Sequence, residues 1–150
     1  MLALADLRPG HRILEPSAGT GALLAAIDAA GGGSTTVAVE LDRALAEALA
    51  TRYRDVRAAD FLEEAANLGQ FDRIVMNPPF HNGADIAHIG QAVQLLVPGG
   101  RLVALCTDGP RQAEALRPLV EENGGTWEPL PAGTFEGTSV RAVLLSVNRG

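Results

Sequence analysis

The sequence predicts an α/β fold of the Rossmann-like, doubly wound class, with a mostly parallel sheet and helices on both faces. Short runs rich in Val, Ile and Leu alternate along the chain with stretches whose apolar residues recur at helical spacing. Such alternation is typical of parallel strands joined by right-handed helical crossovers. The last two apolar runs follow one another without a helical stretch between them, which predicts an antiparallel strand at one edge of the sheet.

The elements of the first half follow from apolar periodicity and from turn residues. A helix is expected over residues 20–29, because its leucines and isoleucine share one face and three consecutive glycines follow it. Asp42 is the expected N-cap of a second helix, and a third, short helix is expected over 61–68. The strands expected in this half cover residues 12–15, 35–40, 55–58 and 71–76.

The second half continues the alternation and then departs from it. A helix is predicted by four apolar residues at helical spacing, namely Ile86, Ile89, Val93 and Leu96. The turn sequence P-G-G at 98–100 separates this helix from a strand expected over 101–106. Pro110 begins another helix, which is expected to reach Glu122. The two final strands are expected over 126–130 and 140–148.

The composition excludes several classes of function. At 150 residues the chain has the size of one ordinary domain, so residues 1–150 are expected to form a single domain. All 12 basic residues are arginine, which excludes mechanisms that need a lysine, such as Schiff-base chemistry and P-loop nucleotide hydrolysis. Cys106 is the only cysteine, so an internal disulfide and a cysteine-rich zinc site are excluded too.

Charge and hydropathy limit the location and the partners. The formal net charge of -6 argues against a protein that binds nucleic acid on its own, because such binding depends on neutralising phosphates. No apolar run approaches the roughly 20 residues of a membrane helix, and no secretory signal is visible. We therefore expect a cytoplasmic protein without a membrane span. The spacing of His11, His81 and His88 suggests no metal site.

A glycine-containing segment, E15-P-S-A-G-T-G21, follows the first expected strand. Gly19 and Gly21 can adopt the backbone angles of a tight turn, and the helix N-terminus just after them offers free N–H groups to a ligand. A plain turn between strand and helix is the alternative. The Glu15 carboxylate would repel a pyrophosphate, so the segment favours a ligand that carries an ammonium or sulfonium group.

Acidic residues end the next two strands. Glu40 lies 19 residues beyond Gly21, close to the spacing at which dinucleotide-binding folds place the acid that binds both ribose hydroxyls. Asp60 could accept a hydrogen from an exocyclic amine, and the Phe61 ring could cover a flat heterocycle. The alternatives are a solvated acid at position 40, and an N-cap followed by a core phenylalanine at 60 and 61.

The segment N77-P-P-F80 ends the fourth strand with an amide, two prolines and an aromatic ring. Prolines end strand pairing and restrict the residue before them, so they could simply terminate the strand. They also hold the Asn77 side-chain oxygen and the Pro78 carbonyl rigidly, where both could accept the hydrogens of a flat amine. The Phe80 ring would then stack on the heterocycle that carries this amine.

Taken together, these motifs resemble those of the class I S-adenosylmethionine-dependent methyltransferases over nearly the whole chain, especially the N6-adenine DNA methyltransferases. The resemblance implies a seven-stranded sheet with an antiparallel last strand, and S-adenosylmethionine as the cofactor. The residues that it implies for cofactor binding are Glu15, Pro16, Ser17, Ala18, Gly19, Thr20, Gly21, Glu40, Leu41, Asp60, Phe61 and Asn77. The residues that it implies for catalysis are Asn77, Pro78, Pro79 and Phe80, with His81 as a further candidate for contact with the substrate.

Several activities are compatible with this resemblance. Methylation of adenine N6 in DNA is the expected reaction, and it requires no metal. The segment N-P-P-F-H-N-G also resembles the guanine-N2 methyltransferases that act on ribosomal RNA, and N-P-P occurs in enzymes that methylate a glutamine amide in protein. A non-catalytic, cofactor-binding subunit of a larger assembly is a fourth alternative. Because no separate target-recognition domain is expected, recognition of the nucleic acid is expected to need a partner subunit or the short loops around the site.

Overall fold

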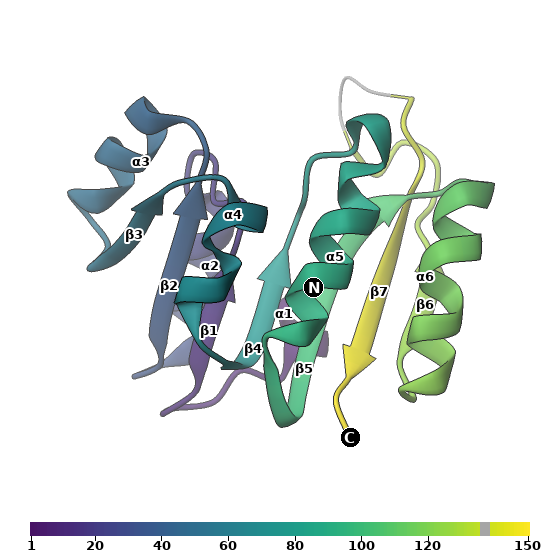
Figure 1. Cartoon of the computed structure of the whole chain (residues 1–150), viewed down its shortest axis with the longest axis horizontal. Helices are drawn as coiled ribbons and strands as arrows, with labels where there is room; N and C mark the ends of the chain where they lie inside the picture. The colour runs from purple at the N-terminus through teal and green to yellow at the C-terminus, as the bar shows by residue number, and fades with distance from the viewer. Residues whose placement is uncertain (136–138) are drawn as a thin grey trace.

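The computed structural model describes residues 1–135 and 139–150 and confirms the predicted α/β class (Figure 1). The described residues form one sheet with the strand order β3-β2-β1-β4-β5-β7-β6. Its strands are β1 (Arg12–Glu15), β2 (Thr35–Glu40), β3 (Asp55–Ala58), β4 (Phe71–Met76), β5 (Leu96–Thr107), β6 (Thr126–Pro129) and β7 (Ala142–Asn148). The α-helices are α1 (Leu2–Ala5), α2 (Ala22–Gly31), α3 (Arg43–Ala50), α4 (Phe61–Leu68), α5 (Ala84–Gln94) and α6 (Pro110–Glu122).

The order of the parallel strands reverses between β1 and β4. On one side of this point the chain adds β2 and β3, and on the other side it adds β5. In open parallel sheets ligands bind beyond the carboxyl ends of the strands at such a switch. β7 is antiparallel to both of its neighbours, β5 and β6. The predicted antiparallel strand is therefore confirmed, but its predicted place at the edge is wrong, because β7 lies between β5 and the edge strand β6.

Helices cover both faces of the sheet (Figure 1). In that view α4, α5 and α6 lie in front of the sheet, and α1 and α2 lie behind it. Side chains along β4 alternate between the two faces, as strand geometry requires. Ile74 and Met76 belong to the large apolar cluster under α4 and α5, whereas Val75 belongs to the smaller cluster with Ala5 and Ile27. The two clusters fix the sheet between its two helical layers.

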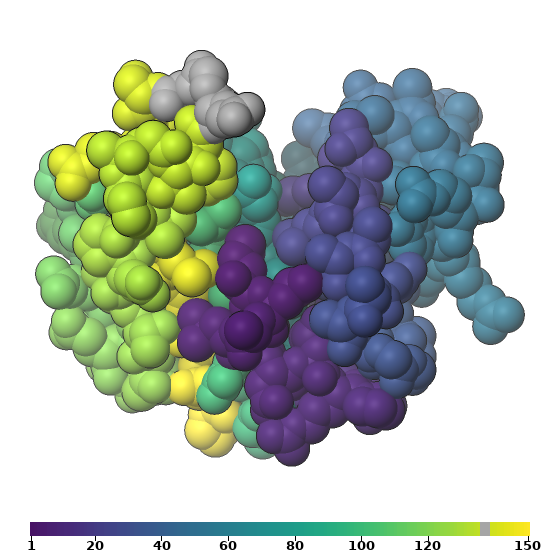
Figure 2. Space-filling model, turned by 180° about the vertical axis from the view of Figure 1, so that it is seen from behind, coloured from purple at the N-terminus to yellow at the C-terminus, as the bar shows by residue number. Residues whose placement is uncertain are grey.

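The short helix α1 was not predicted from the sequence. An isolated helix of four residues has no stability in water, so tertiary contacts must hold it. Ala5 is fully buried, the Arg73 guanidinium donates to the Ala5 carbonyl at 2.7 Å, and that of Arg101 donates to the Leu4 carbonyl at 3.0 Å. Figure 2 shows the resulting N-terminal segment on the rear face, between α2 and the C-terminal strands. This segment is thereby fixed to the side of the sheet opposite α4 and α5.

Several element boundaries differ from the predicted ones: β6 ends at Pro129 and β7 begins at Ala142, whereas the predicted strands cover 126–130 and 140–148, and Leu96 lies in β5 rather than in the predicted helix. Helix α2 begins at Ala22, because Gly21 has a φ of 91° and cannot belong to a right-handed helix. Strand β5 begins at Leu96, and the P-G-G sequence lies inside it. Leu96 pairs with Phe71 of β4, and a shift in register between Phe71 and Arg73 accommodates the extra residues.

No helix in the described part of the chain is long and apolar enough to cross a membrane.

Candidate functional site

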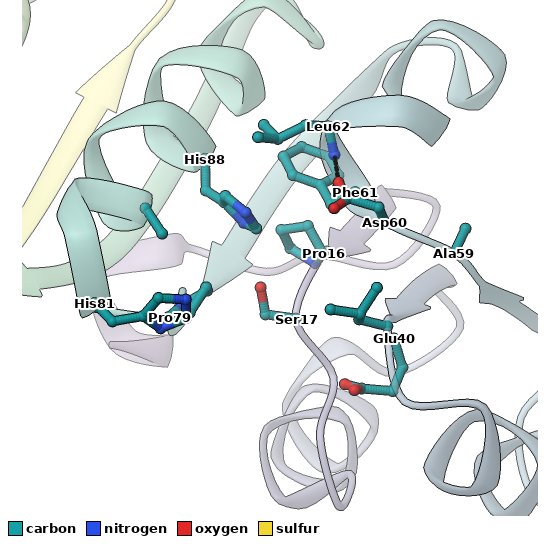
Figure 3. Close-up of a pocket in the computed structure, with 12 residues that line it drawn as sticks. Pro16, Ser17, Glu40, Ala59, Asp60, Phe61, Leu62, Pro79, His81 and His88 are labelled. Atoms are coloured by element: carbon teal, nitrogen blue, oxygen red, sulfur yellow. Dashed lines mark hydrogen bonds between the residues drawn. The ribbon is translucent and has the colours of Figure 1, made fainter.

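A cavity of about 490 Å³ opens beyond the carboxyl ends of the parallel strands (Figure 3). Its walls come from the segments after β1, β2, β3 and β4 and from the start of α5. The residues that line it are Pro16, Ser17, Glu40, Leu41, Ala59, Asp60, Phe61, Leu62, Pro79, His81, Ala84 and His88. Segments that are far apart in the sequence thus meet at the point where the strand order reverses.

The glycine-containing segment after β1 forms the tight turn that its sequence predicts. Gly19 and Gly21 both have positive φ angles, of 55° and 91°. The positive φ favours glycine at position 21, where a Cβ atom would also lie 2.6 Å from a methyl carbon of Leu49 and would force that side chain to shift. The Ala18 amide donates to the Val39 carbonyl at 3.0 Å, which fixes the turn against the end of β2.

Glu40 connects this turn to the start of α3. One oxygen of its carboxylate accepts from the Gly19 amide at 2.5 Å, and the other accepts from the Asp42 amide at 2.9 Å. Asp42 caps α3 by accepting from the Leu45 amide at 3.0 Å, so the cap and the cavity-facing acid are different residues. Since a carboxylate offers about four lone-pair positions, Glu40 retains acceptor capacity for a ligand's hydroxyl groups.

The start of α4 supplies the opposite wall. Asp60 caps the helix by accepting from the Leu62 amide at 2.8 Å, and Phe61 is only 2% exposed. The cap and the core phenylalanine are thus both present, and the two residues also line the cavity. At the mouth, Leu41 and Leu62 have exposed fractions of 72% and 43%. Apolar side chains held in water at the rim of a concave site favour an aromatic ligand.

Glu15 lies beneath the turn and is 1% exposed. Its carboxylate accepts from the Ser17 amide at 2.8 Å. Burial raises the pKa of Glu15 to about 8, the Ser17 amide opposes this shift, and the Glu40 charge adds to it. The acid is therefore largely protonated at neutral pH in the ligand-free chain, and a cation placed beside it would favour its ionisation.

The N-P-P-F segment continues from β4 towards the cavity. Pro78 is buried, Phe80 is half-buried and Pro79 lines the cavity. Asn77 is exposed, and its side chain makes no hydrogen bond within the part of the chain that the structure describes. A 3-10 turn, His81–Gly83, follows and brings His81 to the cavity wall.

The structure brings together some of the predicted site residues and leaves others outside the cavity. Those that line it are Pro16, Ser17, Glu40, Leu41, Asp60, Phe61, Pro79 and His81. Those that do not are Glu15, Ala18, Gly19, Thr20, Gly21, Asn77, Pro78 and Phe80. Gly19 and Thr20 line a smaller hollow of about 180 Å³ beside α3 instead.

Comparison with known proteins decides the family. The model of the methyltransferase small domain matches residues 2–123, which is most of the chain. The chain belongs to the methyltransferase small domain family. It matches no curated protein sequence.

Solved structures of methyltransferases share the fold. TrmN from Thermus thermophilus is 28% identical with a TM-score of 0.67, and the match covers 98% of this chain and 46% of TrmN. The 16S rRNA N2 G1207 methyltransferase RsmC from T. thermophilus, solved with AdoMet and guanosine, is 25% identical with a TM-score of 0.69, over 99% of this chain and 40% of RsmC. A class I methyltransferase structure from Listeria monocytogenes, 20% identical with a TM-score of 0.72 over 98% and 56%, supports the fold alone. The chain spans about half the length of these proteins.

The methyltransferase small domain uses S-adenosylmethionine as its methyl donor. The residues present fit this cofactor, because an acid that can bind a diol and an apolar slot of suitable size occupy the same cavity. The cofactor supplies an activated methyl group on a sulfonium. In the described ranges no group of three or more His, Cys, Asp and Glu side chains could hold a metal ion.

His88 lines the cavity but was not predicted as a site residue. From the sequence it is a helical histidine that could lie on the surface or be partly packed. His81 lies in the turn before α5 and not on the helix itself, so no helical spacing relates the two histidines and the sequence carries no clear signal for His88. The structure places both histidines at the cavity wall.

Substitution of Glu40 tests its assignment to the cofactor. We expect Glu40→Ala to weaken binding of S-adenosylmethionine by roughly 1.5 to 3 kcal/mol, the cost of two charge-assisted hydrogen bonds. The affinity of Glu40→Gln should lie between those of the wild type and Glu40→Ala, because glutamine keeps the size and one acceptor but loses the charge. Isothermal titration calorimetry measures all three proteins, with Glu47→Ala on the exposed side of α3 as the matched control. Unchanged affinity in Glu40→Ala, or tighter binding of NAD than of S-adenosylmethionine, would contradict the assignment.

Proposed function

We propose that the protein transfers the methyl group to an exocyclic amino nitrogen of a nucleobase, with guanine N2 in RNA as the first candidate. The observation that carries this proposal is the position of N77-P-P-F80. The segment leaves the central strand β4 and its Pro79 lines the cofactor cavity, which supports a role for the neighbouring Asn77 side chain and Pro78 carbonyl in holding the substrate amine.

The chemistry of an exocyclic amine explains why such a segment would be needed. The lone pair of this nitrogen is delocalised into the ring, so the nitrogen is a weak nucleophile. The Asn77 side-chain oxygen and the Pro78 carbonyl would accept its two hydrogens and draw it towards a tetrahedral geometry. The prolines hold these acceptors before the substrate arrives, which is the preorganisation that stabilises a transition state. The attack is then an in-line displacement on the methyl carbon.

Two observations favour RNA and guanine. His81 and Gly83 follow N-P-P-F directly, as in the N-P-P-F-H-N-G sequence that resembles guanine-N2 enzymes. RsmC, whose substrate is a guanine of 16S rRNA, is 25% identical over 99% of this chain. Adenine N6 in DNA is the second candidate, because E15-P-S-A-G-T-G21 together with N-P-P-F resembles the N6-adenine enzymes.

The net charge bears on how the substrate is held. At -6 the isolated chain should bind nucleic acid weakly, in the non-specific range of about 10⁻⁴ to 10⁻⁶ M at physiological salt. We infer that a partner subunit or another segment contributes to recognition. A cytoplasmic location fits such a substrate.

The test is a methyl-labelling experiment. The protein is incubated with methyl-labelled S-adenosylmethionine and, separately, with DNA, ribosomal RNA and cell protein, and the labelled product is hydrolysed and identified. We expect N2-methylguanosine from RNA, and far slower labelling when the Asn77→Ala variant is used. N6-methyladenine from DNA would replace the first candidate by the second. Label in glutamine, or cofactor binding without transfer to any of the three, would overturn the proposal in favour of a protein methyltransferase or a non-catalytic subunit.

A further inference from the structure

Two residues with unpartnered buried polar atoms line the cavity. In the described part of the chain, four buried side-chain polar atoms lack a hydrogen-bond partner: Ser17 Oγ, Thr36 Oγ1, His88 Nδ1 and Thr107 Oγ1. Ser17 and His88 both line the cavity. Buried polar groups without partners are uncommon in native proteins, and their presence at a ligand site indicates that the ligand completes or compensates for them.

The His88 imidazole is well placed to touch a ligand. His88 comes from α5 and is half-buried, and its ring centroid lies 5.5 Å from that of Phe61 at an interplanar angle of 52°. Figure 3 shows the imidazole pointing into the cavity towards Phe61 and Pro16, across from Glu40. If the hydroxyl groups of a ligand lie at Glu40, the imidazole of His88 therefore faces the opposite end of that ligand.

The two ring nitrogens of His88 have different surroundings. Nδ1 is shielded from solvent and has no partner, whereas Nε2 is neither shielded nor hydrogen-bonded within the described chain. The tautomer with its proton on Nε2 leaves only an unpaired acceptor at Nδ1, and it directs the N–H donor to the open side of the ring. Nε2 is therefore the nitrogen available to a ligand.

The surroundings also keep this imidazole neutral. Burial lowers the pKa of His88, and the charge of His81 acts in the same direction, while Asp60 and Asp85 oppose the shift. A proton added to Nδ1 would create a buried donor without a partner. At neutral pH His88 thus offers one donor to the cavity without placing a positive charge beside a cationic cofactor.

We propose that His88 is a specificity-determining residue for the cofactor, and that its Nε2–H donates a hydrogen bond to a ring nitrogen of the cofactor's base. This inference rests on the placement of the ribose at Glu40 within the proposed function. Asp60, at the same end of the cavity, accepts from the exocyclic amine of that base. Donor and acceptor together recognise adenine, because its edge carries both an amine and unprotonated ring nitrogens. Phe61 and Leu41 supply the apolar contacts to its faces.

The experiment combines protein variants with analogues of the base. Calorimetry measures the affinity of S-adenosylhomocysteine and of its 1-deaza and 7-deaza forms, each of which lacks one ring nitrogen, for the wild type, His88→Leu and His88→Gln. We expect His88→Leu to lose about three- to tenfold in affinity for the parent compound, the range for one neutral hydrogen bond. We expect His88→Gln, which keeps an N–H donor at a similar reach, to recover most of that loss. One deaza analogue should bind more weakly than the parent to the wild type, but equally well to His88→Leu.

The analogues distinguish a contact from a general packing effect. His11→Gln is the matched control, because His11 lies before β1 and away from the cavity, and melting curves verify that each variant is folded. If both deaza analogues lose the same affinity in the wild type and in His88→Leu, His88 makes no bond to the base and the inference is overturned. If the wild type binds no S-adenosylhomocysteine at all, the placement of the cofactor itself fails.

Discussion

Replacement of Asn77 by alanine is expected to lower the rate of methyl transfer by about 10² to 10³, while binding of S-adenosylmethionine stays nearly unchanged. Asn77 is exposed and lies outside the lining of the cofactor cavity, so its proposed contact is with the substrate amine alone. The proposed contact would strengthen as the nitrogen becomes tetrahedral, and so would act mainly in the transition state. The expected loss is that of one preorganised polar contact in an active site.

The same variant separates catalysis from strand termination. Because the Asn77 side chain makes no hydrogen bond in the described chain, Asn77→Ala should melt within a degree or two of the wild type. Phe80→Ala is the comparison, since it should weaken substrate binding by roughly 1 to 3 kcal/mol if a base stacks on the ring. Melting, cofactor affinity and turnover are measured on both. Full turnover in Asn77→Ala would end the proposal that the N-P-P-F segment activates an amine.

The second large effect concerns the pH dependence of folding. The pKa of buried Glu15 is about 8, against an ordinary value of 4.5. Because burial favours the protonated acid in the folded state, Glu15 leaves the folded protein at its full stability below the pKa that the acid has in the unfolded chain. This stability is lost as the pH rises through the pKa that the acid has in the folded state. Between pH 5 and pH 9 this one group should lower the free energy of unfolding by roughly 3 to 4 kcal/mol, at about 1.4 kcal/mol for each pKa unit.

Glu15→Gln removes the titrating group and keeps its shape. We expect the free energy of unfolding of this variant, measured by denaturant titration without cofactor, to depend much less on pH between 5 and 9 than that of the wild type. Asp28→Asn is the control, because it removes one negative charge from an exposed position on α2. Equal pH dependence in the wild type and Glu15→Gln would mean that Glu15 is not held protonated by its burial.

The sequence predicts those parts of the fold that depend on local pattern. The bounds of β2, β3 and β4 and of α4 agree with the prediction, because each has a clear period or a strong terminator next to it, such as Asp60 before α4 and the prolines after Met76. Helix α1 could not be predicted, since it depends on hydrogen bonds from the Arg73 and Arg101 side chains, which lie 68 and 97 positions further along the chain than the carbonyls they bind. The place of β7 inside the sheet likewise depends on pairing between distant strands.

The residues of the candidate site were likewise predictable only where they depend on local sequence pattern. Motif spacing leads directly to Glu40 and Asp60, because both follow strands whose carboxyl ends meet at one edge. Motif spacing gives no indication of the hydrogen bond between the Glu40 carboxylate and the Gly19 amide, or of the position of Asn77 outside the cavity. His88 was missed because its place at the cavity depends on the packing of α5 against α4, where its ring meets that of Phe61.

The two strands that end the sheet limit how the protein can associate. β3 has four residues, and its Arg57 is paired with Asp55 at 2.8 Å and with Glu64 at 3.1 Å. β6 also has four residues and ends at Pro129, which has no N–H to donate. Short, charged or proline-ended edges offer a poor template for an additional strand. A partner that delivers the nucleic acid would thus dock on helices and loops rather than extend the sheet, and the same edges protect the protein from strand-mediated aggregation.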